Sequence, residues 1–190
     1  MVRHGESEWN VARIVQGQND TSHLTPLGRA QANDVADALR NLSFDHLVTS
    51  DLHRARETAD IIGASLGLSP TLDELLRERC FGVFEGGPGN ELTSTATGHA
   101  RGVVLDANAR PPGGESLRDV VDRAERFVER ASGTWPGERV LVVTHGGMIN
   151  ALHLAYLGEP LEGRSWFRVG NCEVWTPEGP AAVTLEGDGM

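Results

Sequence analysis

The apolar positions of this chain alternate between short runs typical of buried strands and longer stretches with helical spacing. Strand-like runs cover residues 44–50 and 139–144. Helical spacing covers residues 26–42, 51–67, 116–131 and 148–158. One face of the third helical stretch collects seven apolar side chains: Leu117, Val120, Val121, Ala124, Phe127, Val128 and Ala131. Strands alternating with amphipathic helices predict an α/β layer architecture with a mostly parallel sheet.

Local signals mark where two of these helices begin and end. Thr25 is a good N-cap for the first one, because its hydroxyl can accept a backbone N–H, and Pro26 suits the first helical position. Gly67 predicts the end of the second helix, because glycine readily adopts the left-handed conformation of a C-cap.

The 190 residues suit one domain covering residues 1–190. Residues 80–115 are rich in Gly, Pro and Thr, so we expect a loop with one short helix there, acting as a lid or specificity segment. Residues 171–187 predict two edge-type strands around a Pro/Gly turn.

Composition narrows the choice of partner. The formal net charge is −10 and no basic cluster occurs, which argues against nucleic acid and anionic membranes as partners. No stretch approaches the roughly 20 apolar residues of a membrane span, and the first residues do not resemble a signal peptide, so we expect a cytoplasmic protein. Cys80 and Cys172 match no zinc or redox spacing and are expected to be reduced thiols.

Three predicted strand ends carry candidate chemistry. They read "VRHG" at residues 2–5, "VTSDLHRA" at 48–55 and "VTHGG" at 143–147. Open α/β sheets bind ligands at the carboxyl ends of their strands, and a glycine after each histidine allows a sharp turn and a close approach to a ligand. Taken alone, either histidine motif is weak evidence for a binding or catalytic site.

Taken in order, these motifs resemble the histidine phosphatase superfamily, the phosphoglycerate-mutase-like enzymes. The matching segments are "RHGESEWN", "QGQNDTSHLTPLGRAQA", "SDLHRARETA", "LRERCFG", "PGGES" and "VTHGG", which extend over residues 2 to about 150. The resemblance implies a three-layer α/β/α sandwich with a mostly parallel central sheet. It also implies a histidine acid-type phosphatase, a phosphoric monoester hydrolase of the phosphatase branch.

The resemblance assigns roles residue by residue. His4 is implied as the nucleophile that forms a phosphohistidine, which requires a neutral imidazole with one free nitrogen. Arg3 and Arg54 are implied to hold the phosphoryl oxygens through charge-assisted hydrogen bonds. His145, with Gly146 beside it, and Asn10 complete the expected phosphate-binding set.

Glu78 matches the carboxyl that protonates the leaving oxygen and then accepts a proton from water. Positioning and positive charge are the main requirements of phosphoryl transfer, so we expect neither a metal nor another cofactor. None of the seven histidines falls in a common metal-binding spacing.

Each of these residues has an ordinary explanation when taken singly. His4 could belong to a frayed terminus, Arg54 to a solvated helix face, and Glu78 to the surface. The joint order of four such residues favours the catalytic interpretation. The remaining histidines are expected at the surface or in caps, and the tryptophans in packing: His23, His46, His53, His99, His153, Trp135, Trp166 and Trp175.

The family divides into phosphatases and mutases. The related mutases carry a longer basic insertion after the acid motif and a tyrosine where this chain has Phe81. Here the insertion is short and free of lysine, with Arg101 and Arg110 as its arginines. We therefore expect hydrolysis of a small phosphorylated metabolite, with a cofactor-dependent phosphoglycerate-type mutase as the alternative.

Three questions stay open at this level. The substrate and pathway are not readable, although residues 80–115 and the surroundings of Arg13, Gln16 and His53 should form the specificity wall. The edge strands near the end of the sequence would suit a homodimer. Only Met1 and Val2 precede the Arg-His-Gly triplet, so we expect either upstream residues or an unusually short first strand.

Overall fold

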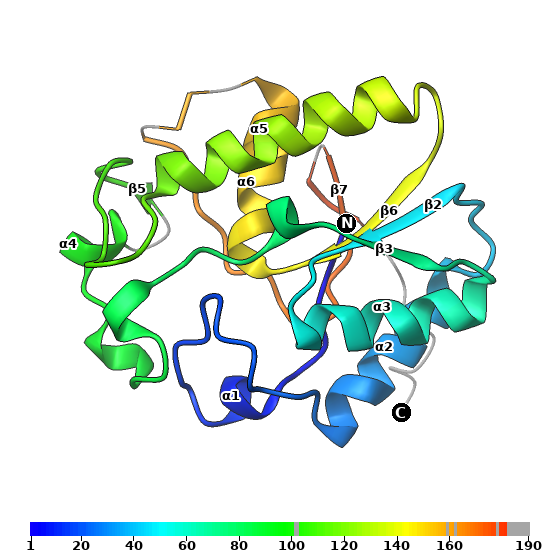
Figure 1. Ribbon diagram of the computed structural model, residues 1–190, viewed down its shortest axis with the longest axis horizontal. Helices are drawn as coiled ribbons and strands as arrows, with labels where there is room; N and C mark the ends of the chain where they lie inside the picture. Colours follow the sequence, from blue (N-terminus) through cyan, green and yellow to red (C-terminus); the bar gives the residue numbers. More distant parts are fainter. Residues whose placement is uncertain (101–102, 159, 162, 178, 182–190) are drawn as a thin grey trace.

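A four-stranded parallel sheet forms the centre of the computed structural model, which describes residues 1–100, 103–158, 160–161, 163–177 and 179–181 (Figure 1). The strand order is β1-β6-β2-β3, and every neighbouring pair is parallel. The strands are β1 (Val2–Arg3), β2 (His46–Thr49), β3 (Pro70–Leu72) and β6 (Val140–Thr144).

Two pairs of helices cover the two faces of this sheet (Figure 1). They are α5 (Leu117–Thr134) with α6 (Gly146–Leu157) on one face, and α2 (Pro26–Leu39) with α3 (His53–Leu66) on the other. Successive side chains of a strand point to opposite faces. Accordingly, Val142 packs with α5 and α6, whereas Leu141 and Val143 pack with α2 and α3. The predicted three-layer α/β/α sandwich is confirmed.

The caps expected from the sequence set the helix boundaries. The Thr25 hydroxyl accepts a hydrogen bond from the Gly28 N–H at 3.0 Å, directly before α2 begins at Pro26. Gly67 ends α3 with a φ of 71°, in the left-handed region that favours glycine. The Ser116 side chain caps α5 in the same way, by accepting from the Asp119 N–H at 3.2 Å.

Residues 80–115 contain more structure than the composition predicted. The one expected short helix is α4 (Ser94–Thr97), and a two-stranded antiparallel pair accompanies it. The pair is β4 (His99–Ala100) with β5 (Val103–Val104), and the segment also contains the short 3-10 turns η2 (Gly82–Phe84) and η3 (Gly89–Glu91). A further 3-10 turn, η1 (Glu74–Leu76), precedes the segment. Strands of two residues are too short for alternation to show in the sequence, and the same holds for β3.

The first strand is short but paired on both sides. Val2 and Arg3 lie opposite Val143 and Thr144 of β6. On the other side the Arg3 N–H donates to the Glu173 carbonyl at 3.2 Å, so a late segment of the chain completes the pairing. The expectation of upstream residues stays a prediction.

That late segment continues into β7 (Trp175–Thr176), which pairs with β8 (Gly179–Pro180) in a small antiparallel hairpin. The first strand of the predicted tail is thereby confirmed. Most of the second predicted strand falls on residues 182–190, outside the described residues.

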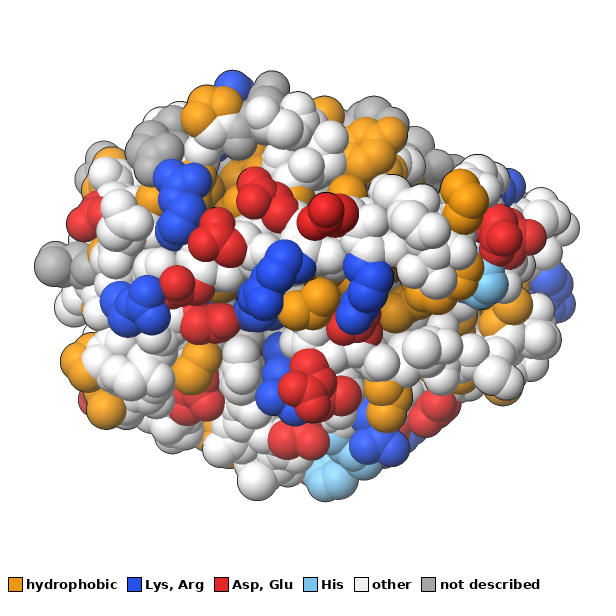
Figure 2. Space-filling view, turned by 45° about the horizontal axis from the view of Figure 1, so that its top comes forward, with side chains coloured by type: hydrophobic (Ala, Val, Ile, Leu, Met, Phe, Trp, Pro, Cys, Tyr) orange, Lys and Arg blue, Asp and Glu red, His pale blue; other side chains and the backbone are white. Residues whose placement is uncertain are grey.

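The surface carries mixed charge. Figure 2 shows acidic and basic side chains interspersed over the face that it presents. Among the described helices, none is long and apolar enough to cross a membrane.

Candidate active site

The sequence-predicted residues meet where β1, β2 and β6 end, because β6 lies between the other two strands. His4 follows β1, Arg54 lies in the first turn of α3 after β2, and His145 follows β6. A cavity of about 710 Å³ opens here. Five predicted residues line it: Arg3, His4, Asn10, Arg54 and Glu78.

His4 is held with one ring nitrogen tied and the other free. Its Nδ1 lies 2.7 Å from the Gly5 carbonyl oxygen, which can only accept, so Nδ1 carries the hydrogen and Nε2 has its lone pair available. The ring is buried, with 3% exposure. Burial, reinforced by Arg54 and Arg3, lowers the pKa of His4 well below 6.5, so the imidazole is neutral at neutral pH.

His145 is fully buried, and its ring centroid lies 5.2 Å from that of His4. Its Nε2 lies 2.9 Å from the Ser50 hydroxyl oxygen. That buried oxygen also accepts the Leu52 N–H at 3.3 Å, and among the described residues Nε2 is the acceptor placed for the Ser50 hydrogen, so the hydroxyl donates to Nε2. The proton of a neutral His145 is therefore on Nδ1. Burial followed by the charge of Arg54 lowers the pKa of His145 well below 6.5, which keeps the ring neutral.

The two predicted arginines are anchored by backbone carbonyls, not by carboxylates. Arg3 donates from Nη1 to the Val169 carbonyl at 2.6 Å. Arg54 donates from Nη1 to Asn19 at 3.1 Å and from Nη2 to Gly17 at 2.8 Å. Burial lowers the pKa of Arg54 to about 10, so the group still carries its charge at neutral pH.

Three donors at this site are left without a partner. Within the described part of the chain, the buried side-chain nitrogens or oxygens lacking a hydrogen bond are Arg3 Nε, Arg54 Nε and His145 Nδ1. A buried, unsatisfied donor costs about 1–3 kcal/mol, and more when it is charged. All three nitrogens belong to residues around His4, since the charges of Arg54 and Arg3 lower its pKa and the His145 ring centroid lies 5.2 Å from that of His4.

Asn10 and Gly146 offer different kinds of donor, a side-chain amide and a backbone N–H. The Asn10 Oδ1 accepts from the Ser7 N–H at 3.1 Å and from Asn171 Nδ2 at 3.2 Å, so its own amide nitrogen is the group left for the cavity. Gly146 is the first residue of α6, where backbone N–H groups lack intrahelical partners. Neither Gly146 nor His145 is among the residues that line the cavity.

Glu78 faces the cavity and is fixed by two backbone donors. Its Oε1 accepts the Arg79 N–H at 2.8 Å, and its Oε2 accepts the Gly147 N–H at 3.1 Å. A Cβ at Gly147 would lie 2.2 Å from Glu78 Oε1, so any larger residue there would force the carboxyl to move. The second glycine of the VTHGG motif, Gly147, thus leaves the space that the Glu78 carboxyl occupies.

A buried ionic network contacts the backbone carbonyl of Glu78. This network was not predicted from the sequence. Arg123 donates to the Glu78 carbonyl at 3.2 Å and pairs with Glu115 at 2.8 Å. Arg79, only 2% exposed, donates to the Glu115 carbonyl at 2.7 Å. The signal for Arg123 was an arginine on the otherwise apolar face of its helix.

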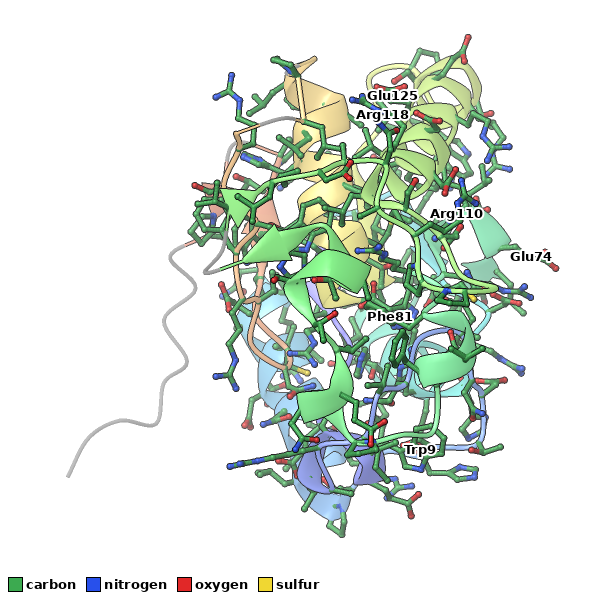
Figure 3. All side chains as sticks on the ribbon, turned by 90° about the vertical axis from the view of Figure 1, so that its left-hand side faces the viewer. Trp9, Glu74, Phe81, Arg110, Arg118 and Glu125 are labelled. Carbon is green, nitrogen blue, oxygen red and sulfur yellow. The ribbon has the colours of Figure 1, made fainter. Side chains whose placement is uncertain are left out.

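Arg168, which the sequence reasoning did not name, joins the predicted wall residues Arg13 and Gln16 at the outer wall of the cavity. Trp9 and Phe81, which are labelled in Figure 3, line it as well. Of the described residues in 80–115, Phe81, Gly89 and Leu92 reach the cavity, whereas His53 does not line it. Arg110 pairs with Asp119 at 2.7 Å outside the lining, and Arg101 lies outside the described residues.

The fold and this site define a phosphoglycerate-mutase-like α/β protein with a cavity at its strand ends that Arg3, Arg54 and the neutral His4 line. The chain belongs to the histidine phosphatase superfamily, branch 1, whose family model matches residues 1–179.

Relatives within the family have different names. The chain is 38% identical over 175 residues to the "Probable phosphoglycerate mutase GpmB" of Salmonella choleraesuis strain SC-B67, covering 92% of this chain and 81% of that protein. A mycobacterial glucosyl-3-phosphoglycerate phosphatase solved with VO3 superposes with a TM-score of 0.77 and 33% identity, covering 91% of this chain and 87% of that one. An alpha-ribazole phosphatase from Shigella flexneri superposes with a TM-score of 0.78 and 26% identity, covering 97% and 94%.

Proposed function

We propose that this protein is a metal-independent phosphomonoesterase that hydrolyses a small phosphorylated metabolite through a phosphohistidine on His4. The observation that carries the proposal is the set of three unpartnered donors beside the free Nε2 of His4. Phosphoryl transfer is accelerated mainly by positioning and by electrostatic stabilisation of the equatorial oxygens, which such donors supply.

In the first half of the reaction, His4 Nε2 attacks phosphorus and the bond from phosphorus to the ester oxygen breaks. The Gly5 carbonyl stabilises the positive charge that develops on the ring through the Nδ1–H. Arg3, Arg54 and the Nδ1–H of His145 donate to the transferring oxygens. Glu78, entering as the carboxylic acid, gives its proton to the leaving oxygen, so that an alcohol departs.

In the second half, the Glu78 carboxylate takes a proton from water as the water oxygen attacks phosphorus. The bond from phosphorus to nitrogen breaks, which releases inorganic phosphate and restores neutral His4 and protonated Glu78. The two backbone donors that fix Glu78 serve both halves, because the same carboxyl must face first the alcohol and then water.

Two observations favour hydrolysis over mutase chemistry. A mutase has to retain its phosphohistidine, whereas here the described part of residues 80–115 contributes three residues to the cavity. Arg110 is paired with Asp119 and does not line the cavity, so it is not placed to hold a carboxylate of the substrate. The phosphatase names of the two structural neighbours agree with this choice.

The mutase remains the second candidate because the curated relatives carry that name. Arg13 and Arg168 also line the cavity and could meet a second anionic group of a substrate, such as a carboxylate. Interconversion of phosphoglycerates stimulated by a bisphosphorylated primer, followed by ³¹P NMR, would favour the mutase.

Phosphate release from an aryl phosphate in the presence of a chelator tests the proposal. We expect His4→Ala to lower kcat by at least about 10³-fold, while His46→Ala, a histidine outside the cavity, leaves the rate unchanged. The wild-type protein, quenched rapidly at alkaline pH, should yield an acid-labile phosphoryl adduct on His4 by mass spectrometry. Equal rates for wild type and His4→Ala would overturn the assignment.

A further inference from the structure

One cluster of side chains with metal-ligating atoms lies near the candidate active site. His23, His53 and Glu57 each offer a ligand atom, and these atoms all lie within 4.8 Å of one another. The two imidazoles meet edge to face, with ring centroids 4.4 Å apart. None of the three lines the catalytic cavity.

The three side chains come from positions whose backbone is already fixed. His53 and Glu57 lie four residues apart in the first turns of α3, so they share one face of that helix. The backbone of His23 is held on both sides by Glu8, whose N–H donates to the His23 carbonyl at 3.0 Å and whose carboxylate accepts the His23 N–H at 3.3 Å. An ion would therefore find its ligands largely preorganised.

We propose that His23, His53 and Glu57 bind one divalent transition-metal ion, such as Zn²⁺ or Co²⁺, outside the catalytic cavity. Two imidazole nitrogens and one carboxylate oxygen suit these ions, with water in the fourth tetrahedral position. Mg²⁺ and Ca²⁺ prefer oxygen ligands and fit this donor set poorly.

A guanidinium group competes for one of the ligands. Arg29 Nη2 lies 2.6 Å from Glu57 Oε1, and the Leu24 N–H donates to Glu57 Oε2 at 3.2 Å. A metal ion must share the carboxylate with Arg29 or displace it. Because the arginine is about half exposed, it can turn into water at little cost.

The location gives the ion a structural role. His53 directly precedes Arg54, whose guanidinium donates to the carbonyls of Gly17 and Asn19. The Asp20 carboxylate, in the same loop, accepts the His53 N–H. An ion held between His23 and α3 would tie this loop to the helix that positions Arg54, without taking part in the proposed reaction.

Calorimetric titration of the full chain with ZnCl₂, after removal of metals by a chelator, tests the site. We expect one ion per chain, a Tm that rises until one equivalent is bound, and a visible absorption band of tetrahedral Co²⁺ with CoCl₂. His23→Ala and Glu57→Gln should each weaken binding at least tenfold. Arg29→Gln should strengthen it several-fold, because the competing cation is gone.

His46→Ala is the matched control, since His46 also faces a carboxylate, that of Glu138, but lies outside the cluster. It should leave the affinity unchanged. Binding that survives in both His23→Ala and Glu57→Gln would overturn the site, as would the lack of saturable binding by wild type. Affinity unchanged or lowered in Arg29→Gln would contradict Glu57 as a ligand. The phosphatase rate of His23→Ala in chelator should equal that of wild type.

Discussion

The Nε2 atom of His145 lies 2.9 Å from the hydroxyl oxygen of Ser50, and both side chains are fully buried. The Ser50 hydroxyl is buried, and among the described residues His145 Nε2 is the acceptor placed for its hydrogen, so the hydroxyl donates to the histidine. Ser50 thereby places the proton of His145 on the nitrogen that lacks a partner in the protein. It is a positioning residue for the phosphate site.

Ser50→Ala should lower kcat for an aryl phosphate about 10- to 100-fold, because neutral His145 loses its fixed tautomer and a donor to the transferring oxygens. Nitrogen-15 chemical shifts of the His145 ring should show a mixture of tautomers, a change that a purely structural role would not produce. Thr49→Val, at the neighbouring buried hydroxyl, serves as control. An unchanged kcat with an unchanged Tm would contradict the role of Ser50.

Inorganic phosphate or vanadate should stabilise the folded protein, because either anion satisfies the three donors that are left unpartnered. At a concentration 100 times Kd, the free energy of unfolding should rise by about 2.7 kcal/mol. Arg54→Gln should abolish most of this rise. Chloride at equal ionic strength is the control, and an equal effect of chloride would show that the stabilisation is not specific to the site.

Stability should decrease as the pH falls below 6.5. In the unfolded chain His4 and His145 titrate near the ordinary pKa of 6.5, whereas in the folded protein burial and the arginines hold their pKa well below it. Between these values the unfolded chain binds protons that the folded protein does not. The free energy of unfolding should therefore drop by up to about 1.4 kcal/mol per pH unit for each imidazole.

Urea unfolding at pH 7.5, 6.5 and 5.5, in buffer without phosphate, measures this dependence. His4→Gln should show a shallower dependence than wild type, by up to about 1.4 kcal/mol per pH unit. The same dependence in both proteins would mean that His4 is not held neutral in the folded state.

Gly147→Ala should displace Glu78 and lower kcat by about 100-fold, with a smaller effect on KM. The new Cβ would lie 2.2 Å from Glu78 Oε1, and the Gly147 N–H that fixes Oε2 would shift with it. Gly133→Ala is the matched control, because that exposed position in α5 has no atom within 4 Å of an added Cβ. The control should leave kcat unchanged and stabilise α5 by about 1 kcal/mol. Equal kcat values for Gly147→Ala and Gly133→Ala would show that the position of Glu78 does not affect the rate.

The sequence predicted the layers of the fold because each main element carries its own signal. α5 has an apolar face, interrupted by Arg123, and a serine cap, and β6 is rich in β-branched residues. The resemblance that the motifs carry placed His4, Arg54 and Glu78 at one site, and for His4 and Arg54 the shared edge at which parallel strands end is the physical reason.

The supporting contacts could not be predicted from the sequence. The Ser50 hydroxyl, the Arg123 network behind Glu78 and the pairing of β1 with Glu173 all join residues far apart in the chain. No local pattern encodes which distant side chain accepts a given donor. Arg13 was predicted at the cavity wall, but Arg168 was missed for the same reason, since it reaches the cavity from a late loop.

His4, the proposed nucleophile, lies early in the sequence, yet late residues complete its surroundings. The Val169 carbonyl accepts from Arg3, Asn171 donates to the His4 carbonyl at 3.0 Å, and Glu173 pairs with β1. During translation, His4 leaves the ribosome long before these partners are made. These contacts around His4 can therefore form only after residues 169–173 have been synthesised, and a nascent chain stalled before Val169 would carry His4 without them.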